Sequence, residues 1–370
     1  MAGLRILITN HSLAARGGSE TYVRDLAVGL VRRGHTPIAY STRLGDMAAE
    51  LRAATVPVID DLGLLGAPPD LIHGQHHLEA MTALLRFPRV PAVFVCHGWL
   101  PWEEAPPRFP RILRYVAVDW TCRDRLLFEH GIPEETIRVL LNAVDLERFA
   151  ARGPLPDRPR RALVLSNNAS ERTYLGAVRE ACARTGLELQ IVGRAAGSES
   201  DRPEAAIRRA DIVFAKGRSA IEALSVGAAV ILCDAVGAGP LVTTRNLEHL
   251  RPLNFGVRAL RDRIDPDILA ERVGAYDAAD AAEVSRRVRA KAGHEDLMDE
   301  ILELYREILE EYRDGAPEPP ASEARAVSDY LRFLSAPLEN HVRRQRRRLA
   351  PGPRVRERLL RLIGGGRVPR

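Results

Sequence analysis

Short apolar runs and amphipathic stretches alternate over the first 150 or so residues of the chain. Residues 19–33 carry an apolar stripe at helical spacing, and Gly34 follows as a stop. One apolar run precedes this predicted helix and another follows it at once, which is the strand, helix, strand order of a parallel sheet. The predicted strands of this half are residues 4–9, 36–41, 69–74, 91–98 and 114–119. The last of them leads into a predicted helix that ends at Gly131.

A second alternation begins after residues 152–161, which are rich in Pro, Gly and Arg, lack periodicity and are typical of a linker. Its predicted strands are residues 161–166, 187–193, 210–215 and 228–234, and its predicted helices are residues 171–183, 204–209 and 219–226. Helical patterns then cover residues 268–312. After a flexible break at residues 315–323, the remainder is predicted to be helical, basic and partly disordered.

Two consecutive halves of this kind predict an α/β fold with two Rossmann-like domains, whose parallel sheets face each other across a cleft. We expect an N-terminal domain at residues 1–152, a C-terminal domain at 153–315, and a linker with a basic helical tail at 316–370. In such sheets ligands lie beyond the carboxyl ends of the strands. That rule selects the residues to examine for function.

The composition fits a globular protein, because 46% of the 370 residues are hydrophobic and 28% are charged. No run of about 18 apolar residues predicts a membrane span, and residues 1–10 are expected to form a strand rather than a signal peptide. The four cysteines form no Cys-x-x-Cys pair, so neither a zinc site nor a redox motif is indicated. A reducing cytoplasm is therefore the expected location.

The net charge of +5 hides an uneven distribution. Residues 341–370 hold eleven arginines and Glu357 as the single acid. This tail could be merely solvated, or it could make peripheral contact with an anionic membrane surface. Nucleic acid is not expected as a partner, because no aromatic residues are interspersed among the arginines to stack on bases.

The sequence from Lys216 to Glu222 follows the predicted strand at 210–215 and opens a helix. A helix N-terminus holds phosphate readily, Gly217 allows close approach, and Lys216 with Arg218 adds full charges. Glu222, one turn further on, could accept hydrogen bonds from a ribose attached to that phosphate. The alternative interpretation is structural, with Ser219 as the helix cap and Lys216 as an exposed loop charge.

Gly17 and Gly18 lie between the first predicted strand and its helix. They do not form a Gly-x-Gly-x-x-Gly motif, and no acid follows the second strand where the ribose of a dinucleotide would need one, so NAD is disfavoured. The pair allows a substrate or phosphate to approach the helix N-terminus. A tight loop that needs positive φ would explain it equally well.

His97 ends the strand at 91–98 and is followed by Trp99, which places both at the predicted cleft. Such a histidine can bind a sugar hydroxyl, transfer a proton or bind a backbone carbonyl. Together with His11 and His76, these residues form the predicted acceptor side. His73, His76 and His77 resemble a metal cluster, but no carboxylate or cysteine recurs at ligand spacing. The Asp-Pro-Asp at 265–267 is expected to cap a helix, so neither a metal nor another cofactor is expected.

These motifs together resemble GT-B glycosyltransferases of the retaining family 4 type over about residues 4–312. The resemblance rests on "RGGSETYVRDLAVGLVRRGH", "FVCHG", "VLLNAVDLERF" and "ADIVFAKGRSAIEALSVGAAVILCD". It implies two Rossmann-like domains, with the acceptor bound mainly by the first and a nucleotide-diphosphate sugar, the donor substrate, by the second.

Residue by residue, the resemblance implies that Gly17 and Gly18 face the donor phosphate and the acceptor. It implies that His97 lies near the reacting sugar and that Glu222, the second glutamate of a Glu-x7-Glu motif, binds the donor ribose. Asn142 and Asp145 match the interdomain "NGVD" stretch of the family, with Ala143 where glycine is usual.

Two departures from the family pattern concern charge. The first glutamate of the motif is replaced by Phe214, and the usual Arg and Lys after the first strand of the second domain are represented by Arg172 alone. We therefore predict that Lys216 and Arg218 supply the missing positive charge to the diphosphate, with Arg194 as a further donor contact. The predicted catalytic group is Gly18, His97, Arg172 and Lys216; Gly17, Gly217, Ser219 and Glu222 complete the donor site.

The predicted activity is transfer of a sugar from a nucleotide-diphosphate donor to an acceptor hydroxyl, with retention at the anomeric carbon. Two alternatives stay open at this point. The chain could be a catalytically silent GT-B module that binds a sugar nucleotide, which the missing first glutamate favours. It could also be a nucleotide-sugar epimerase, which would use paired carboxylates and histidines.

Overall fold

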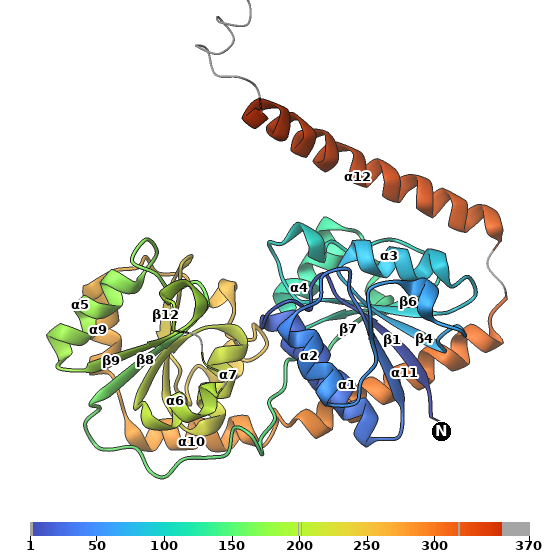
Figure 1. Ribbon diagram of the computed structural model, residues 1–370. Helices are drawn as coiled ribbons and strands as arrows, with labels where there is room; N and C mark the ends of the chain where they lie inside the picture. Colours follow the sequence, from blue (N-terminus) through green and yellow to red (C-terminus); the bar gives the residue numbers. More distant parts are fainter. Residues whose placement is uncertain (1–2, 199, 201, 317–318, 350–370) are drawn as a thin grey trace, which may run out of the picture. The chain divides into compact units, whose positions relative to one another are not determined.

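The computed structural model describes residues 3–198, 200, 202–316 and 319–349. Seven parallel strands form the sheet of the N-terminal half (Figure 1). Ile6, Leu7 and Ile8 lie in an interior strand and have no exposed surface, as expected for a parallel sheet that is covered on both faces. In spatial order the strands are β3 (Val58–Ile59), β2 (Thr36–Tyr40), β1 (Arg5–Thr9), β4 (Leu71–Gln75), β5 (Ala92–Cys96), β6 (Ile112–Ala117) and β7 (Ile137–Val139).

The helices of this half follow the strands in the alternating order that the sequence predicts. Helix α1 buries Tyr22, Leu26 and Leu30, three residues of its predicted stripe. The helix predicted to end at Gly131 is α4 continued by a π-helical turn at Arg125–Glu129. The helices are α1 (Gly18–Arg32), α2 (Asp46–Ala53), α3 (His77–Arg86) and α4 (Trp120–Asp124), with 3-10 turns at Leu62–Leu64, Trp102–Glu104 and Glu134–Thr136.

The second sheet has five strands, of which four are parallel. Its edge strand β12 runs antiparallel to β11, and its sequence Gly-Ala-Gly-Pro-Leu lacks the apolar run by which the other strands were predicted. In spatial order the strands are β12 (Gly237–Leu241), β11 (Ala229–Asp234), β10 (Ile212–Ala215), β8 (Arg161–Leu165) and β9 (Glu188–Val192). The predicted α/β class with two Rossmann-like sheets is confirmed.

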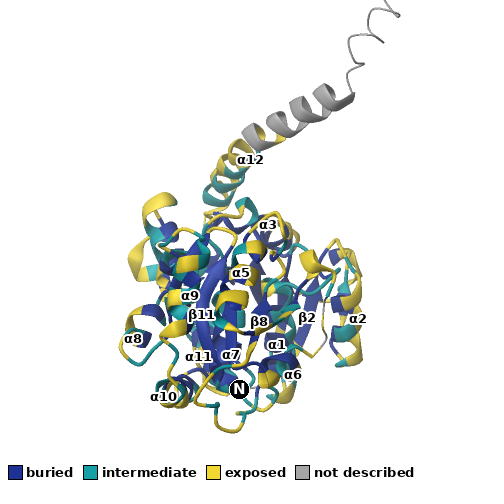
Figure 2. Cartoon of the chain, turned by 90° about the vertical axis from the view of Figure 1, so that its left-hand side faces the viewer, coloured by how far each residue is buried: buried dark blue, intermediate teal, exposed yellow. Residues whose placement is uncertain are grey.

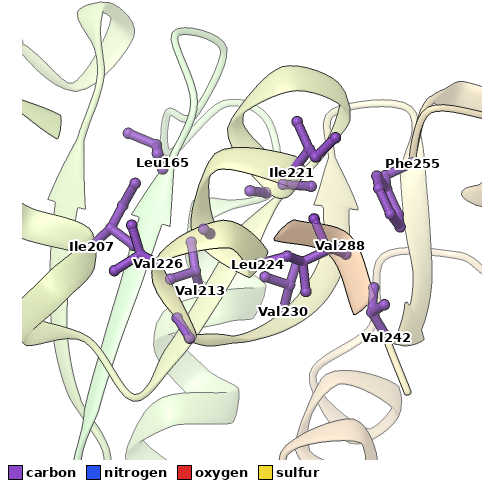
Figure 3. Packing of buried hydrophobic residues seen from close by; sticks show 14 of the residues in the cluster. Leu165, Ile207, Val213, Ile221, Leu224, Val226, Val230, Val242, Phe255 and Val288 are labelled. Atoms are coloured by element: carbon purple, nitrogen blue, oxygen red, sulfur yellow. The ribbon is translucent and has the colours of Figure 1, made fainter. Parts of the chain in front are cut away.

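The helices of the second half cover this sheet, and the buried residues are concentrated in the strands and the inner helix faces (Figure 2). On one face, Ile221 and Leu224 of α7 pack with Val213 and Val230 of the central strands and with Phe255 (Figure 3). The helices are α5 (Leu175–Thr185), α6 (Pro203–Arg209), α7 (Gly217–Val226), α8 (Leu247–Leu250), α9 (Pro266–Gly274) and α10 (Ala278–Arg289), with 3-10 turns at Arg194–Ala196 and Val257–Ala259. This core holds the N-terminus of α7 next to the carboxyl end of β10.

Helix α11 (His294–Asp314) returns to the first half of the chain (Figure 1). Arg33 binds Glu295 and Asp299 at 2.7 and 3.1 Å, and the Tyr305 hydroxyl lies 2.6 Å from Nδ1 of His73. The sequence assigned this helix to the C-terminal domain at residues 153–315. Its amphipathic pattern predicts a buried face but does not identify the surface that the face covers, and in the structure that surface includes α1 and β6.

The last described helix, α12 (Pro320–Leu349), belongs with residues 107–110 to a second compact unit. The helical prediction for the tail therefore holds as far as residue 349, and residues 350–370 lie outside the described residues. None of the described helices combines the length and the apolar composition that a membrane span requires.

Candidate functional site

A cleft of about 280 Å³ lies where the first turns of α1 and α7 face the loops after β8 and β9. We call it the α1–α7 cleft. Gly18, Ser166, Gly193 and Glu222 are among the residues that line it. It lies beyond the carboxyl ends of parallel strands from both sheets, where ligands of such folds bind.

The glycine pair at the start of α1 is not explained by backbone conformation. Gly17 has φ −146°, which any residue can adopt, and Gly18 is not among the glycines with positive φ. A Cβ added to Gly18 would find no atom within 4 Å, whereas one added to Gly17 would overlap the carboxylate of Glu20, a flexible side chain that can move. Of the two interpretations of the pair, the positive-φ loop is excluded, and close approach by a ligand is favoured.

The N-terminus of α1 is available to an anion. No side chain caps it, and the first backbone hydrogen bond runs from the Thr21 amide to the Gly17 carbonyl at 3.1 Å. The three preceding amides therefore have no partner within the helix. Glu20 lies in this turn and accepts a hydrogen bond from the Ser19 hydroxyl at 3.1 Å, which partly offsets the positive end of the helix dipole.

The N-terminus of α7 differs from the predicted arrangement. Lys216 occupies the cap position without a side-chain hydrogen bond, and Ser219 is the third residue of the helix rather than its cap. Gly217 has φ +55°, a conformation that favours glycine, and its amide donates to the Phe255 carbonyl at 2.9 Å. The amides of Arg218 and Ser219 come next and have no acceptor within the helix.

The side chain of Lys216 forms an ion pair with Asp234, a carboxylate that is 1% exposed. Lys216 does not line the α1–α7 cleft, and neither do Arg172 and Arg194. Arg172 is exposed, whereas Arg194 donates to the Arg16 carbonyl at 2.6 Å. Of the four predicted donor cations, the structure thus places Arg218 in this cleft and the other three outside it.

Two other arginines line the cleft, and the sequence argument missed both. Arg16 forms an ion pair with Glu50 at 2.7 Å, and Arg148 forms one with Glu204 at 3.0 Å. Arg16 directly precedes the glycine pair, which was the available clue to its position. Arg148 comes from the junction stretch, where its place among other charged residues gave no such indication.

Glu222 lines the cleft and is 8% exposed. Its Oε1 accepts a hydrogen bond from Nε of Arg218 at 3.0 Å. Burial raises the pKa of the Glu222 carboxyl, and the positive charge of Arg218 opposes that rise. Arg218 also donates to Asp25 of α1, so this arginine joins the two halves of the cleft.

A second cleft of about 460 Å³, the α7–β5 cleft, adjoins the first and shares Gly18, Arg218 and Ser219 with it. His97 and Trp99, which follow β5, also line it. The ring of Trp99 lies 5.8 Å from the guanidinium carbon of Arg258. The structure therefore places two of the predicted acceptor-side residues next to the glycine pair of the first cleft.

His97 is held by its neighbours and keeps a free ring nitrogen. Its amide donates to Glu104 at 2.8 Å, and its ring meets the Tyr22 ring edge-on at 4.6 Å between centroids. Burial lowers the pKa of His97 to about 4, so the imidazole is neutral at pH 7. Its Nε2 is buried and has no hydrogen-bond partner within the described chain.

His11 and His76, the other predicted acceptor-side residues, line neither cleft. Nδ1 of His76 accepts from the His11 amide at 3.0 Å, and its Nε2 lies 3.5 Å from Glu104. Burial lowers the pKa of His76, but the hydrogen bond and charge of Glu104 outweigh it and the net shift is upward. These histidines therefore support Glu104, which in turn holds the backbone of His97.

His73 and His77, the other members of the histidine group, are buried, with His73 2% exposed. The ring of His77 meets that of Trp102 edge-on at 4.3 Å between centroids. The contacts of His73 are polar. Its two ring nitrogens lie 2.6 Å from the Tyr305 hydroxyl and 3.4 Å from that of Tyr22. Burial lowers its pKa to about 3. Within the described ranges no three His, Cys, Asp or Glu side chains converge as metal ligands would.

Several solved structures of known proteins resemble this chain. A glycosyltransferase from Rickettsia africae is 16% identical to this chain, covers 83% of it and 99% of its own length, and superposes with a TM-score of 0.63. HepE from Anabaena, solved with UDP and glucose, is 16% identical, with 82% and 99% covered and a TM-score of 0.60. The chain has the GT-B fold. At these identities the similarity establishes the architecture and not the reaction.

Other comparisons bear on the family. A family model described as Glycosyltransferase Family 4 matches residues 62–148 of this GT-B chain. A putative UDP-N-acetylglucosamine 2-epimerase from Listeria monocytogenes is 15% identical over 86% of this chain and 100% of its own, with a TM-score of 0.52. None of the curated proteins compared with the chain shows significant similarity to it.

Phe214 and the junction residues Asn142 and Asp145 occupy different environments in this GT-B fold. Phe214 is fully buried in β10, so the position of the missing glutamate is in the hydrophobic core and not in either cleft. At the junction, Asn142 lines the α7–β5 cleft, and Asp145 accepts the amide of Arg148 at 3.0 Å. Asp265 caps α9 as predicted, accepting from the Asp267 amide at 2.9 Å.

Proposed function

We propose that this protein is a retaining glycosyltransferase that moves a sugar from a nucleotide-diphosphate donor to an acceptor hydroxyl. The observation that carries the proposal is the shared wall of the two clefts. Gly18 and Ser219, at the N-termini of two helices, line both cavities, one with Glu222 and the other with His97. A diphosphate at this wall would place its nucleoside in the α1–α7 cleft and its sugar beside His97.

Three groups bind the donor in this proposal. The unpaired amides at the start of α1 and the Arg16 guanidinium bind phosphate oxygens, because a helix N-terminus and an arginine both favour anions. The buried Glu222 accepts hydrogen bonds from ribose hydroxyls. Direct contacts from Arg172, Arg194 and Lys216 to the diphosphate stay predictions, as does direct acceptor contact by His11 and His76.

The proposed reaction breaks the bond between the anomeric carbon and the diphosphate oxygen, and the nucleoside diphosphate leaves with the electron pair. The acceptor oxygen forms its bond to the same face of the anomeric carbon and gives its proton to the departing phosphate oxygen. Helix N-termini and arginine charge stabilise the leaving group electrostatically, without a metal ion. The neutral His97 imidazole binds a hydroxyl of the transferred sugar or of the acceptor, which orients it for attack.

A thermal-shift series with UDP, GDP, ADP and dTDP, and with their hexose conjugates, tests donor binding. A ligand at 100 times its Kd stabilises the folded chain by about 2.7 kcal/mol, which is easily measured. The proposal expects one nucleoside diphosphate to stabilise the wild type and Glu222→Gln to weaken that effect. It also expects the nucleoside diphosphate to be released faster when an acceptor is added, in the presence of EDTA as well as in its absence.

The structural likeness to a putative epimerase supports a second candidate, and the ionised Glu104 beside His76 is a carboxylate–histidine pair of the kind such a reaction uses. An epimerase would change the configuration of the donor sugar without an acceptor and without net release of nucleoside diphosphate. A silent binding module would bind the donor and turn over nothing. NMR of the sugar nucleotide after incubation, with and without candidate acceptors, separates the three.

Peripheral contact between residues 341–370 and an anionic membrane is retained as part of the proposal, because eleven arginines lie there. Cosedimentation with phosphatidylglycerol vesicles should fall when the chain is ended at residue 340. Binding to nucleic acid is not expected.

A further inference from the structure

An alternating series of charged side chains joins the two ends of the α1–α7 cleft. Arg218 of α7 binds Glu222 at 3.0 Å and also binds Asp25 of α1. Arg24 binds the other oxygen of Asp25 at 2.8 Å and reaches Glu50 of α2 at 3.1 Å. Glu50 binds Arg16 at 2.7 Å. In order, the charge series is Glu222, Arg218, Asp25, Arg24, Glu50 and Arg16.

Only part of this charge series is placed to meet a ligand in that cleft. Its two end members, Glu222 and Arg16, line the α1–α7 cleft, as does Arg218. Asp25, Arg24 and Glu50 do not line it. A carboxylate that accepts hydroxyl protons and a guanidinium that binds phosphate are the two groups that a nucleoside diphosphate requires.

The Glu222 end of the charge series is the more buried. The side chain of Asp25 is 9% exposed and that of Glu222 is 11% exposed, compared with 27% for Glu50 and 37% for Arg16. Buried charges interact more strongly than exposed ones, and a buried ion that loses its partner is strongly unfavourable. The position of Arg218 therefore depends mainly on Asp25, which belongs to the other half of the cleft.

One oxygen of Glu222 is committed to Arg218, and within the described chain Oε2 makes no hydrogen bond. The orientation of this free oxygen follows from the side-chain rotamer that Arg218 selects. We propose that Asp25 is a positioning residue, which fixes Glu222 through Arg218 so that its free oxygen meets the ribose hydroxyls of a bound nucleotide. This inference rests on the proposed function, because it presumes that a nucleoside diphosphate occupies the cleft.

The proposal also gives Arg218 a different role from direct diphosphate binding. Two carboxylates already neutralise its charge, so it serves as the link between α1 and α7. Because Asp25 lies on α1 and Glu222 on α7, hydroxyl recognition depends on the two helices being held together.

The experiment compares UDP and GDP with their 2′-deoxy forms, because the ratio of the two dissociation constants isolates recognition of the 2′-hydroxyl. In the wild type, the ribo form should bind about tenfold more tightly, because the deoxy form lacks the hydroxyl that donates a hydrogen bond to the Glu222 carboxylate. Glu222→Gln should reduce that preference to about twofold. Asp25→Asn, which touches no ligand, should reduce it by a similar factor, and should add nothing in the Glu222→Gln background.

Asp299→Asn is the matched control, because it removes a carboxylate that pairs with Arg33 at an exposed site far along the chain from the charge series. It should keep the tenfold preference. Arg24→Gln is the second variant, used if Asp25→Asn does not fold, since its side chain is 26% exposed and tolerates change. It should weaken the preference by a smaller factor.

The outcomes distinguish failure of the positioning role of Asp25 from failure of the proposed function. A purely structural Asp25 would lower the affinity for ribo and deoxy forms equally and leave their ratio intact. If Glu222→Gln removes the preference while Asp25→Asn keeps it, the positioning role is wrong and the proposed function stands. If no nucleoside diphosphate binds the wild type, the proposed function fails and the positioning role fails with it.

Discussion

The two sides of the clefts differ in the kinds of residues that form them. On the N-terminal side, the half-buried His97 and the buried Glu104 line the α7–β5 cleft and are joined by a hydrogen bond, and the buried His76 contacts Glu104. The buried His73 contacts Tyr22, whose ring meets that of His97. The C-terminal side includes Ser166, Gly193 and Gly217, whose side chains are small or absent, with Glu222 as its buried carboxylate. In the proposed reaction, the first side can orient hydroxyls through fixed polar groups. The second can receive a flat base and ribose where side chains are small.

The difference also predicts which kind of change each side tolerates. A surface formed by glycines and small residues depends on steric fit, so an added methyl group disturbs it. A site made of buried imidazoles depends on keeping them neutral, so acid disturbs it. A steric substitution should therefore affect mainly the C-terminal side, and a fall in pH should affect mainly the N-terminal side.

The largest effect is expected from Gly193→Ala on the C-terminal side. A Cβ at this position would overlap the carbonyl oxygen of Ser166 in the neighbouring loop, which is a backbone atom and cannot move aside as the end of a flexible side chain can. We expect a loss of about 3 kcal/mol in the free energy of unfolding, measured by urea denaturation. Gly176→Ala is the control, because it lies inside α5 with only a side-chain oxygen 3.8 Å away. It should leave stability unchanged or raise it slightly, and an equal loss in both variants would contradict the steric explanation.

The next largest effect is a loss of folding stability in acid, which arises on the N-terminal side. Burial holds the pKa of His73 at about 3, compared with 6.5 for an unperturbed histidine, so the unfolded chain binds a proton that the folded chain does not. The resulting stability is complete above pH 6.5 and is lost as the pH falls below it, by about 2 kcal/mol at pH 5. His73→Gln keeps a neutral group that can bind Tyr305. It should show a correspondingly smaller difference between urea denaturation at pH 7.5 and at pH 5; equal differences in both proteins would exclude His73 as the cause.

Much of this architecture was predictable, because alternating apolar runs fix the order of strands and helices and parallel strands bring their carboxyl ends together. Gly18, His97 and Glu222 were found in that way. The antiparallel β12 was not, since its glycines carry no apolar pattern. The return of α11 to the first half was missed because amphipathicity does not specify a partner surface.

The missed site residues share a physical reason. Asp25 lies next to Arg24 on a helix and would ordinarily be taken as a solvated charge, and only the folded chain shows it buried beneath Arg218. Arg16 and Glu104 lie in loops whose direction the sequence does not give. Lys216 was predicted from its position beside a helix N-terminus, but the partner that takes up its charge, Asp234, comes from another strand.

A smaller effect is expected where the two sides meet, at Gly18. The space around its Cα is open within the chain, so Gly18→Ala should leave the free energy of unfolding within about 0.5 kcal/mol of the wild type. A phosphate that approaches the α1 amides would meet the new methyl group. We therefore expect about tenfold weaker binding of the preferred nucleoside diphosphate in isothermal titration. Unchanged affinity would show that the anion does not approach at Gly18.

The smallest effect on stability is expected from substitution of Lys216, a charged residue on the C-terminal side. Asp234 is 1% exposed and its Oδ1 has no hydrogen-bond partner in the described chain, so Lys216 is needed to compensate it. The lysine side chain is 31% exposed, and solvent screens the pair, so Lys216→Met should cost about 1 kcal/mol of stability. That loss should shrink in the Asp234→Asn background. The lysine lines the α7–β5 cleft and not the α1–α7 cleft, so a nucleoside diphosphate affinity within twofold of the wild type would overturn the predicted contact between Lys216 and the diphosphate. A tenfold loss of affinity that persists in Asp234→Asn would instead support direct diphosphate binding by Lys216.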